Sequence, residues 1–129
     1  MNDELMDRII ELTGSGLCCS QILMQMVGLD ARGEENPEMV KAMGALGYGL
    51  YSQLTCGALT GAACALALYG DSRDACKEEL QKLNLWFAER FGSCSCCDIL
   101  GKGNPPTPHC QEIVLETVEK CFELLEEKL

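Results

Sequence analysis

Apolar residues recur at helical spacing along most of the chain. Near the N-terminus, Leu5, Ile9 and Leu12 alternate with charged residues in the pattern of an amphipathic helix. The C-terminal stretch keeps the same spacing from Ile113 to Leu125. No run of useful length alternates with the two-residue period of a strand. The pattern predicts an all-α fold, a compact bundle of about five to six helices with a cysteine-rich loop.

Turn and cap residues divide this pattern into separate helices. Glycine is favoured just after a helix, whereas asparagine, serine, threonine and proline are favoured where one begins. The expected helices are a first that ends at Gly14 and Gly16, a second from about Leu17 to a C-cap at Gly28, a third from Asn36 and Pro37, a fourth capped by Thr55 and closed by Gly70, a fifth from Asp71 and Ser72, a short one from Cys96 to Leu100, and a last from Thr107 and Pro108.

Length and composition point to one domain, residues 1–129, whose core needs no disulfides to fold. Hydrophobic residues make up 47 % of the chain and aromatic residues only 5 %, so aliphatic side chains and methionine must supply most of the packing. The aromatic share of the core should come mainly from Trp86, Phe87 and Phe91 in the fifth helix. The 10 cysteines therefore need a chemical explanation.

The charge and the N-terminus narrow the class of protein. A formal net charge of -10, with no local cluster of lysine or arginine, argues against nucleic-acid binding. The first residues are acidic and lack the basic and apolar regions of a secretory signal, so we expect a cytoplasmic protein. In that reducing compartment, cysteines serve as metal ligands or redox groups more often than as static disulfides.

One stretch, residues 42–70, carries no charged residue and is long enough to span a bilayer. Glycine and polar residues interrupt it, however, and its second half is mostly alanine and glycine. We expect no membrane association but two helices packed closely through small residues. Gly57 and Gly61 form a GxxxG pattern, which lets two helix backbones approach.

Many of the cysteines fall at the predicted helix starts. The unpaired N–H groups and the dipole of a helix N-terminus favour a thiolate over a thiol. A dipole contribution of about 0.3–1 kcal/mol shifts a pKa by only about 0.2–0.7 units, so one helix end does not ionise a cysteine fully, whereas metal coordination does. The cysteines at helix starts are Cys18, Cys19, Cys56, Cys96, Cys97 and Cys110.

The remaining cysteines and the one histidine are less informative. Cys64, Cys76 and Cys121 lie within helices, where we interpret them as small buried hydrophobic residues. His109, next to Cys110, is interpreted as a solvated or cap residue and less readily as a ligand or proton donor.

Cys94 and Cys97 form a CxxC motif, which occurs in redox dithiols, zinc sites and cluster sites alike. Asp98 stands where a c-type haem attachment requires histidine. No βαβ pattern surrounds the motif, which disfavours a thioredoxin fold, and the second CxxC of a paired zinc site is absent.

The spacing of Cys19, the block CGALTG from Cys56 to Gly61, Cys96 with FGS upstream, and Cys110 resembles the redox-active protein family named for its C_GCAxxG_C_C pattern. The resemblance spans nearly the whole chain. It implies that Cys19, Cys56, Cys96 and Cys110 form the functional set, with Cys18, Cys94 and Cys97 as extra candidates. A similar domain is associated with split-Soret cytochromes, where an iron–sulfur centre is implied; this chain lacks CxxCH and would not share their haem.

Three functions follow as hypotheses. In the first, four thiolates bind an iron–sulfur cluster, 2Fe–2S or 4Fe–4S, for electron transfer, and the acidic chain docks to a basic redox partner protein. In the second, Cys56 is the nucleophile of a metal-free thiol–disulfide protein, resolved through Cys94 with Cys97 or Cys96 with Cys110. In the third, the thiolates hold zinc or another soft metal. The sequence leaves open whether the protein forms a homodimer.

Overall fold

The computed structural model describes residues 2–100 and 108–127, and these are overwhelmingly helical. Apart from one antiparallel bridge between Thr55 and Ser95, no strand pairing occurs in the described residues, so the all-α prediction is confirmed. The helices are α1 (Asn2–Gly14), α2 (Cys19–Leu23), α3 (Pro37–Met43), α4 (Gly57–Ala67), α5 (Arg73–Phe91), α6 (Cys96–Leu100) and α7 (Pro108–Glu126).

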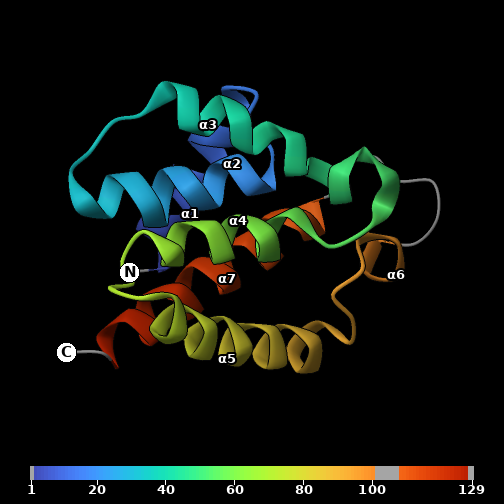
Figure 1. Ribbon diagram of the computed structural model, residues 1–129. Coiled ribbons are helices and arrows are strands. Elements are labelled where there is room, and N and C mark those ends of the chain that lie inside the picture. The colour runs from blue at the N-terminus through green and yellow to red at the C-terminus, as the bar shows by residue number, and fades with distance from the viewer. Residues whose placement is uncertain (1, 101–107, 128–129) are drawn as a thin grey trace.

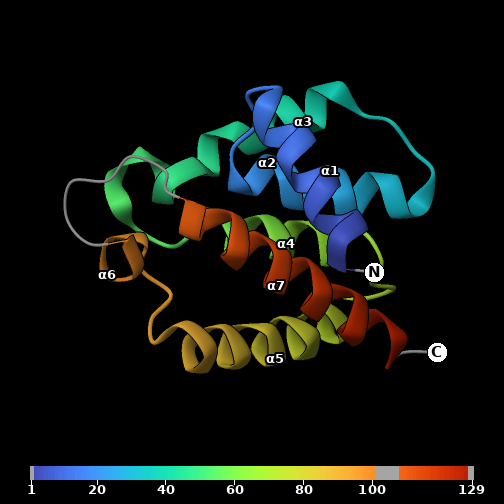
Figure 2. The same ribbon diagram turned by 180° about the vertical axis from the view of Figure 1, so that it is seen from behind.

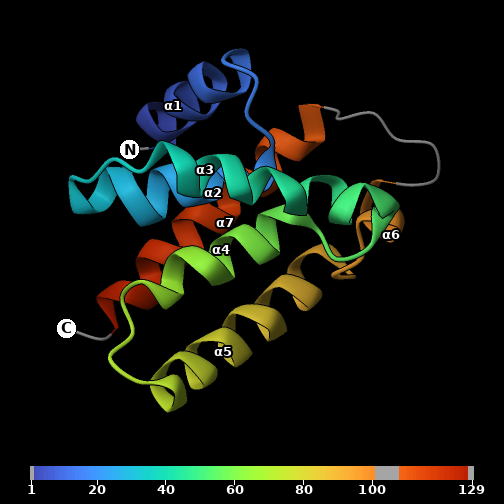
Figure 3. The ribbon, with the colours of Figure 1, turned by 45° about the horizontal axis from the view of Figure 1, so that its top comes forward.

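Helices α4 and α7 form the middle of the bundle. Helix α4 packs against α2, α5 and α7, and α7 packs against α1, α2 and α5 (Figures 1 and 2). Helices α2 and α3 lie on one side of this central pair and α5 on the other (Figures 1 and 3). The short α6 lies at the end of the bundle away from the two chain termini (Figure 1).

Apolar side chains at the predicted helical spacing fill the core. Ile9 and Leu12 of α1 are buried, as are Val114 and Val118 of α7. In α5, Phe87 is fully buried and lies edge-on to Phe91, with ring centroids 4.7 Å apart. The aromatic part of the core therefore comes from α5, which is the fifth helix that the sequence predicted to supply it.

Several predicted helix starts are confirmed by their caps. The Asn36 side chain accepts a hydrogen bond from the Met39 backbone N–H at 3.1 Å, and Ser72 accepts one from Ala75 at 3.1 Å. Each satisfies an N–H that the first helical turn leaves unpaired. Helix α6 has the predicted bounds. The expected cap Thr107 lies outside the described residues.

Two predicted boundaries are wrong. The second helix does not end at Gly28, because the chain continues through a π-helical segment, Met24–Leu29, and a 3-10 turn, Asp30–Arg32, and stops at Gly33 with a φ of 67°. Gly28 serves close packing instead, since a Cβ there would lie 2.5 Å from the sulfur of Met24. Thr55 is not the cap of α4 either; Cys56 occupies that position, and Thr55 pairs with Ser95.

The uncharged stretch 42–70 is broken into shorter pieces. Between α3 and α4 the backbone takes positive φ at Tyr48, Leu50, Tyr51 and Gln53, a conformation that interrupts regular helix. Across residues 2–100 and 108–127, no helix has the length and apolar character needed to cross a membrane.

Candidate four-cysteine site

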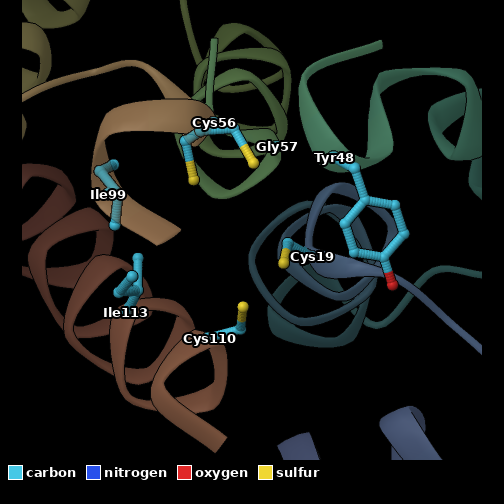
Figure 4. A pocket seen from close by; sticks show the side chains of 8 residues that line it. Cys19, Tyr48, Cys56, Gly57, Ile99, Cys110 and Ile113 are labelled. Atoms are coloured by element: carbon cyan, nitrogen blue, oxygen red, sulfur yellow. The ribbon is translucent and has the colours of Figure 1, made fainter. Parts of the chain in front are cut away.

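Cys19, Cys56, Cys96 and Cys110 line one small cavity at the α6 end of the bundle. Its other lining residues are Tyr48, Gly57, Ile99 and Ile113. In Figure 4 the side chains of Cys19, Cys56 and Cys110 point into the same space. The structure thus brings together the four cysteines that the family resemblance singles out, although the first and last of them, Cys19 and Cys110, lie far apart in the sequence.

Each of the four cysteines lies at the N-terminal end of a different helix. Cys19 is the first residue of α2, Cys56 is the N-cap of α4, Cys96 is the first residue of α6 and Cys110 is the third residue of α7. Helix N-termini carry partial positive charge and unpaired N–H groups. The cavity is therefore bordered by groups that stabilise negative charge on sulfur.

A backbone contact holds Cys56 next to the cysteine-rich segment. The Cys56 N–H donates a hydrogen bond to the Cys94 carbonyl at 2.8 Å, and the Cys96 N–H donates to the Leu54 carbonyl at 2.6 Å. These two bonds flank the antiparallel bridge between Thr55 and Ser95. The entry to α4 and the entry to α6 are consequently one paired unit.

The glycines of the CGALTG block let α4 lie directly on α2. A Cβ at Gly61 would lie 2.7 Å from the Cα and 2.7 Å from the carbonyl oxygen of Ser20, distances that no side chain tolerates. A Cβ at Gly57 would lie 3.2 Å from the carbonyl oxygen of Leu46. This confirms the close approach that the GxxxG pattern predicted. Its consequence is that the Cys56 end of α4 reaches the Cys19 end of α2.

Polar side chains at the start of α2 fix the position of Cys19. The hydroxyl of buried Ser20 donates to the Met43 carbonyl at 2.7 Å. The amide of Gln21 donates to the Val40 carbonyl at 3.1 Å, and its oxygen accepts from the Cys18 backbone N–H at 3.0 Å. These bonds tie the N-terminal turn of α2 to α3, so Cys19 is held from one side by α3 and from the other by α4.

Burial has the largest effect on the pKa of Cys56 in the site. The pKa of Cys56 is raised to about 11, because desolvation outweighs the N–H groups of Ala58 and Leu59, which lower it, and the neighbouring Cys96 and Cys110 raise it further. The helix N-terminus thus acts in the predicted direction but is too weak, as the dipole magnitude implies. Without a bound cation, the Cys56 thiol is neutral at physiological pH.

Cys19 is linked most strongly to Cys110. Hydrogen bonding with the Cys110 side chain is the largest cause that raises the pKa of Cys19 well above its ordinary value, followed by desolvation and by repulsion from Cys56, Cys110 and Cys18. Several buried thiolates side by side would repel one another. The group is therefore stable as neutral thiols, as a disulfide, or as thiolates around a cationic centre.

Tyr48 is a residue of this site for which the sequence offered no motif. Its ring lines the cavity beside Cys19 (Figure 4), and its backbone has a φ of 50°. Desolvation, then Cys19, Cys18 and Cys110, raise the pKa of its phenol. The only hint in the sequence was its position between Gly47 and Gly49 in an uncharged segment.

The other five cysteines whose side chains the structure describes do not line the cavity. Cys18 lines an adjacent groove, and Cys94 is half-buried beside the core. Cys121 is fully buried, as predicted, and desolvation raises its pKa to about 12. The prediction for Cys64 is wrong, because this residue is exposed on α4, and Cys76 is only half-buried. The side chains of Cys97 and His109 lie outside the described residues.

The described thiols share a cavity but do not form a preformed metal site. Among the described side chains, no group of three or more cysteine, histidine, aspartate or glutamate residues is arranged to hold one metal ion. A tetrahedral zinc site would need sulfur atoms about 2.3 Å from the metal. The free volume of the cavity is about 10 Å³, which admits about one water-sized sphere. A larger group would have to push the lining side chains outward.

Comparison with known proteins gives one match. A family model described as "Putative redox-active protein (C_GCAxxG_C_C)" matches residues 17–124, which include all four cysteines of the cavity. Searches of the curated proteins and of the solved structures returned no match.

Proposed function

The chain belongs to this C_GCAxxG_C_C family of redox-active proteins, and we propose that Cys19, Cys56, Cys96 and Cys110 bind an iron–sulfur cluster through which the protein transfers electrons. The observation that carries the proposal is the convergence of four cysteines, each from a different helix N-terminus, on one cavity.

The chemistry of the lining suits such a cluster. Four thiolates are the usual ligand set of 2Fe–2S and 4Fe–4S clusters. The other described lining residues are apolar apart from Tyr48, so no carboxylate or amine in that described lining competes with sulfur for the metal. The N–H groups of Ala58 and Leu59 would favour the negative charge on a bound Cys56 thiolate. When bound, the cluster supplies one-electron transfer at a buried position.

The acidity of the thiols argues against Cys56 as a free nucleophile. A thiolate is the reactive form, and with a pKa of about 11 only about one Cys56 in ten thousand is ionised at pH 7. Its side chain is also buried, which keeps a disulfide substrate away. Metal binding removes both difficulties, because it replaces the protons and needs no external substrate at sulfur.

Cluster binding requires the cavity to widen beyond its free volume of about 10 Å³. Helix α6 is a short element at the end of the bundle, since it spans only Cys96–Leu100, and it carries Ile99 into the lining. A small outward shift of the turn around Ile99, beyond the paired entries of α4 and α6, would enlarge the space without disturbing α4 and α7 at the centre of the bundle.

A second candidate function has one observation in its favour. Hydrogen bonding pairs the Cys19 and Cys110 thiols, and loss of two electrons and two protons from this pair to an oxidant would form one disulfide. Oxidising metal-free protein and mapping the disulfide by mass spectrometry tests this candidate. A Cys19–Cys110 bond that forms reversibly supports it, whereas unpaired Cys19 and Cys110 exclude it.

The partner is proposed to be a basic redox protein. The net charge of -10 would attract and orient such a partner and would make association weaker as ionic strength rises.

The cluster itself is tested by optical spectroscopy on protein purified without oxygen. Visible absorption that dithionite bleaches and air or ferricyanide restores supports the proposal; a colourless protein after anaerobic reconstitution with iron and sulfide contradicts it.

A further inference from the structure

A groove of about 430 Å³ adjoins the four-cysteine cavity. It lies between the end of α1, the start of α2 and the start of α7, and it shares Cys19, Tyr48 and Cys110 with the cavity. The two spaces therefore meet at these side chains. Its volume falls in the range of pockets that hold small organic molecules.

The described residues that line the groove carry no charge. Ile9, Ile22 and Val114 give it an apolar wall, and among the described residues no lysine, arginine, aspartate or glutamate lines it. In a chain with a net charge of -10, an anion such as a nucleotide would find long-range repulsion and no cation in this described lining. A cation would find no carboxylate there. The described lining therefore favours an uncharged molecule.

Three polar side chains interrupt the apolar lining: Thr13, Tyr48 and Gln111. The Thr13 hydroxyl already donates to the Ile9 carbonyl at 2.8 Å, so it offers an acceptor more than a donor. Gln111 is half-buried, and Tyr48 lines the groove as well as the cavity. An uncharged ring with carbonyl or hydroxyl groups matches such a mixture of apolar and hydrogen-bonding surface.

We propose that this groove binds a small uncharged quinone-type ring against the Cys19 and Cys110 side of the four-cysteine site. The quinone class rests on the proposed electron-transfer function, because a bound ring there would touch two of the proposed cluster ligands. The selection of an uncharged and largely apolar ring does not rest on it, since that follows from the lining alone.

The experiment uses duroquinone, whose fully methylated ring blocks addition by thiols. Its binding to the full-length protein is measured by ligand-observed NMR, which needs no electron transfer. Thr13→Trp places an indole in the groove and should weaken binding at least about tenfold, a change of about 1.4 kcal/mol. Ser15→Trp, in the turn just after α1 but not in the groove lining, should leave it within about twofold. Gln111→Trp is the second blocking variant if Thr13→Trp does not fold.

The anionic probe anthraquinone-2-sulfonate should bind more weakly than duroquinone. The inference would be overturned if duroquinone did not bind, if it bound equally well to the blocked variants, or if the sulfonate bound more tightly than duroquinone. Iron and sulfide content, measured on the same samples, separates this from the proposed function. If the protein contains iron but does not bind duroquinone, only the groove proposal fails. If the protein takes up no iron but binds duroquinone in a way that Thr13→Trp weakens, only the cluster proposal fails.

Discussion

The backbone N–H of Cys56 donates a hydrogen bond to the carbonyl of Cys94 at 2.8 Å, and this bond joins the start of α4 to the segment before α6. Its companion, from the Cys96 N–H to the Leu54 carbonyl, completes the pair around Thr55 and Ser95. Two proposed ligands are thus held by backbone contacts that do not depend on a metal.

Hydrogen exchange should reveal this pairing in metal-free protein. The amides of Cys56 and Cys96 lie at helix starts, where N–H groups commonly exchange quickly for lack of intrahelical partners. Because both donate across the bridge, we expect protection of about a hundredfold or more over an unstructured peptide, measured by NMR. Exchange of both amides at the unstructured rate would show that the metal-free chain does not form this pairing.

Gly61→Ala should separate α4 from α2. The added methyl group would press on the backbone of Ser20, and overpacking of this kind costs about 1–3 kcal/mol of unfolding free energy. Denaturant unfolding measures the loss. Since the same contact brings Cys56 to Cys19, iron uptake should fall as well.

Gly14→Ala is the matched control for this substitution. A Cβ at Gly14 would meet no atom within 4 Å, so the change should leave stability within about 0.5 kcal/mol and leave iron uptake intact. Equal losses from the two variants would contradict the role assigned to Gly61.

Single cysteine substitutions should divide the ten thiols into two groups. Cys56→Ser removes a proposed ligand while nearly preserving shape, and we expect it to lower iron content several-fold. Cys64→Ser, on the exposed face of the same helix, should retain iron at the level of the unmodified protein. Inductively coupled plasma analysis of both proteins, reconstituted together, makes the comparison. Similar iron content in the two would remove Cys56 from the ligand set.

The metal-free protein should lose stability at alkaline pH. The folded-state pKa of Cys56 is raised to about 11 and that of Cys121 to about 12, so the native state keeps protons that the unfolded chain loses above about pH 9. Each such thiol lowers the unfolding free energy by up to about 1.4 kcal/mol per pH unit between these limits. Below about pH 8, neither thiol makes the unfolding free energy depend on pH.

Cys121→Val tests this assignment, because valine keeps an apolar side chain in the core and cannot ionise. The variant should show a shallower decline of stability between about pH 9 and 12 in denaturant titrations. An unchanged slope would show that Cys121 titrates in the folded state much as it does in the unfolded chain.

Local signals in the sequence were sufficient to locate most helices. Asn36 and Ser72 cap where expected because their hydrogen bonds are made within one turn. The prediction of Thr55 as a helix cap was wrong. Threonine is a common cap residue, but Thr55 pairs with Ser95, which is distant in the sequence. The prediction of Gly28 as a helix C-cap was wrong for the same reason. The flanking sequence is typical of a helix end, but the glycine is needed there for close packing against Met24 and Leu68.

The candidate site shows the same division. The predicted helix starts singled out six cysteines, and the family resemblance implied which four of them form a set. The structure places those four on one cavity. Tyr48 could not be found, because its place depends on a non-helical backbone segment and on contacts across the bundle. The direction of the pKa shifts was also missed: burial outweighs the helix N-terminus, and burial is a property of the fold.

The most direct test of the central claim is the amount of iron and acid-labile sulfide per chain in protein purified without oxygen. The account predicts iron and sulfide in matching amounts, about two or four of each per chain, lost together when any one of Cys19, Cys56, Cys96 and Cys110 is replaced by serine. Protein that contains neither, and that takes up neither on anaerobic reconstitution, would contradict it.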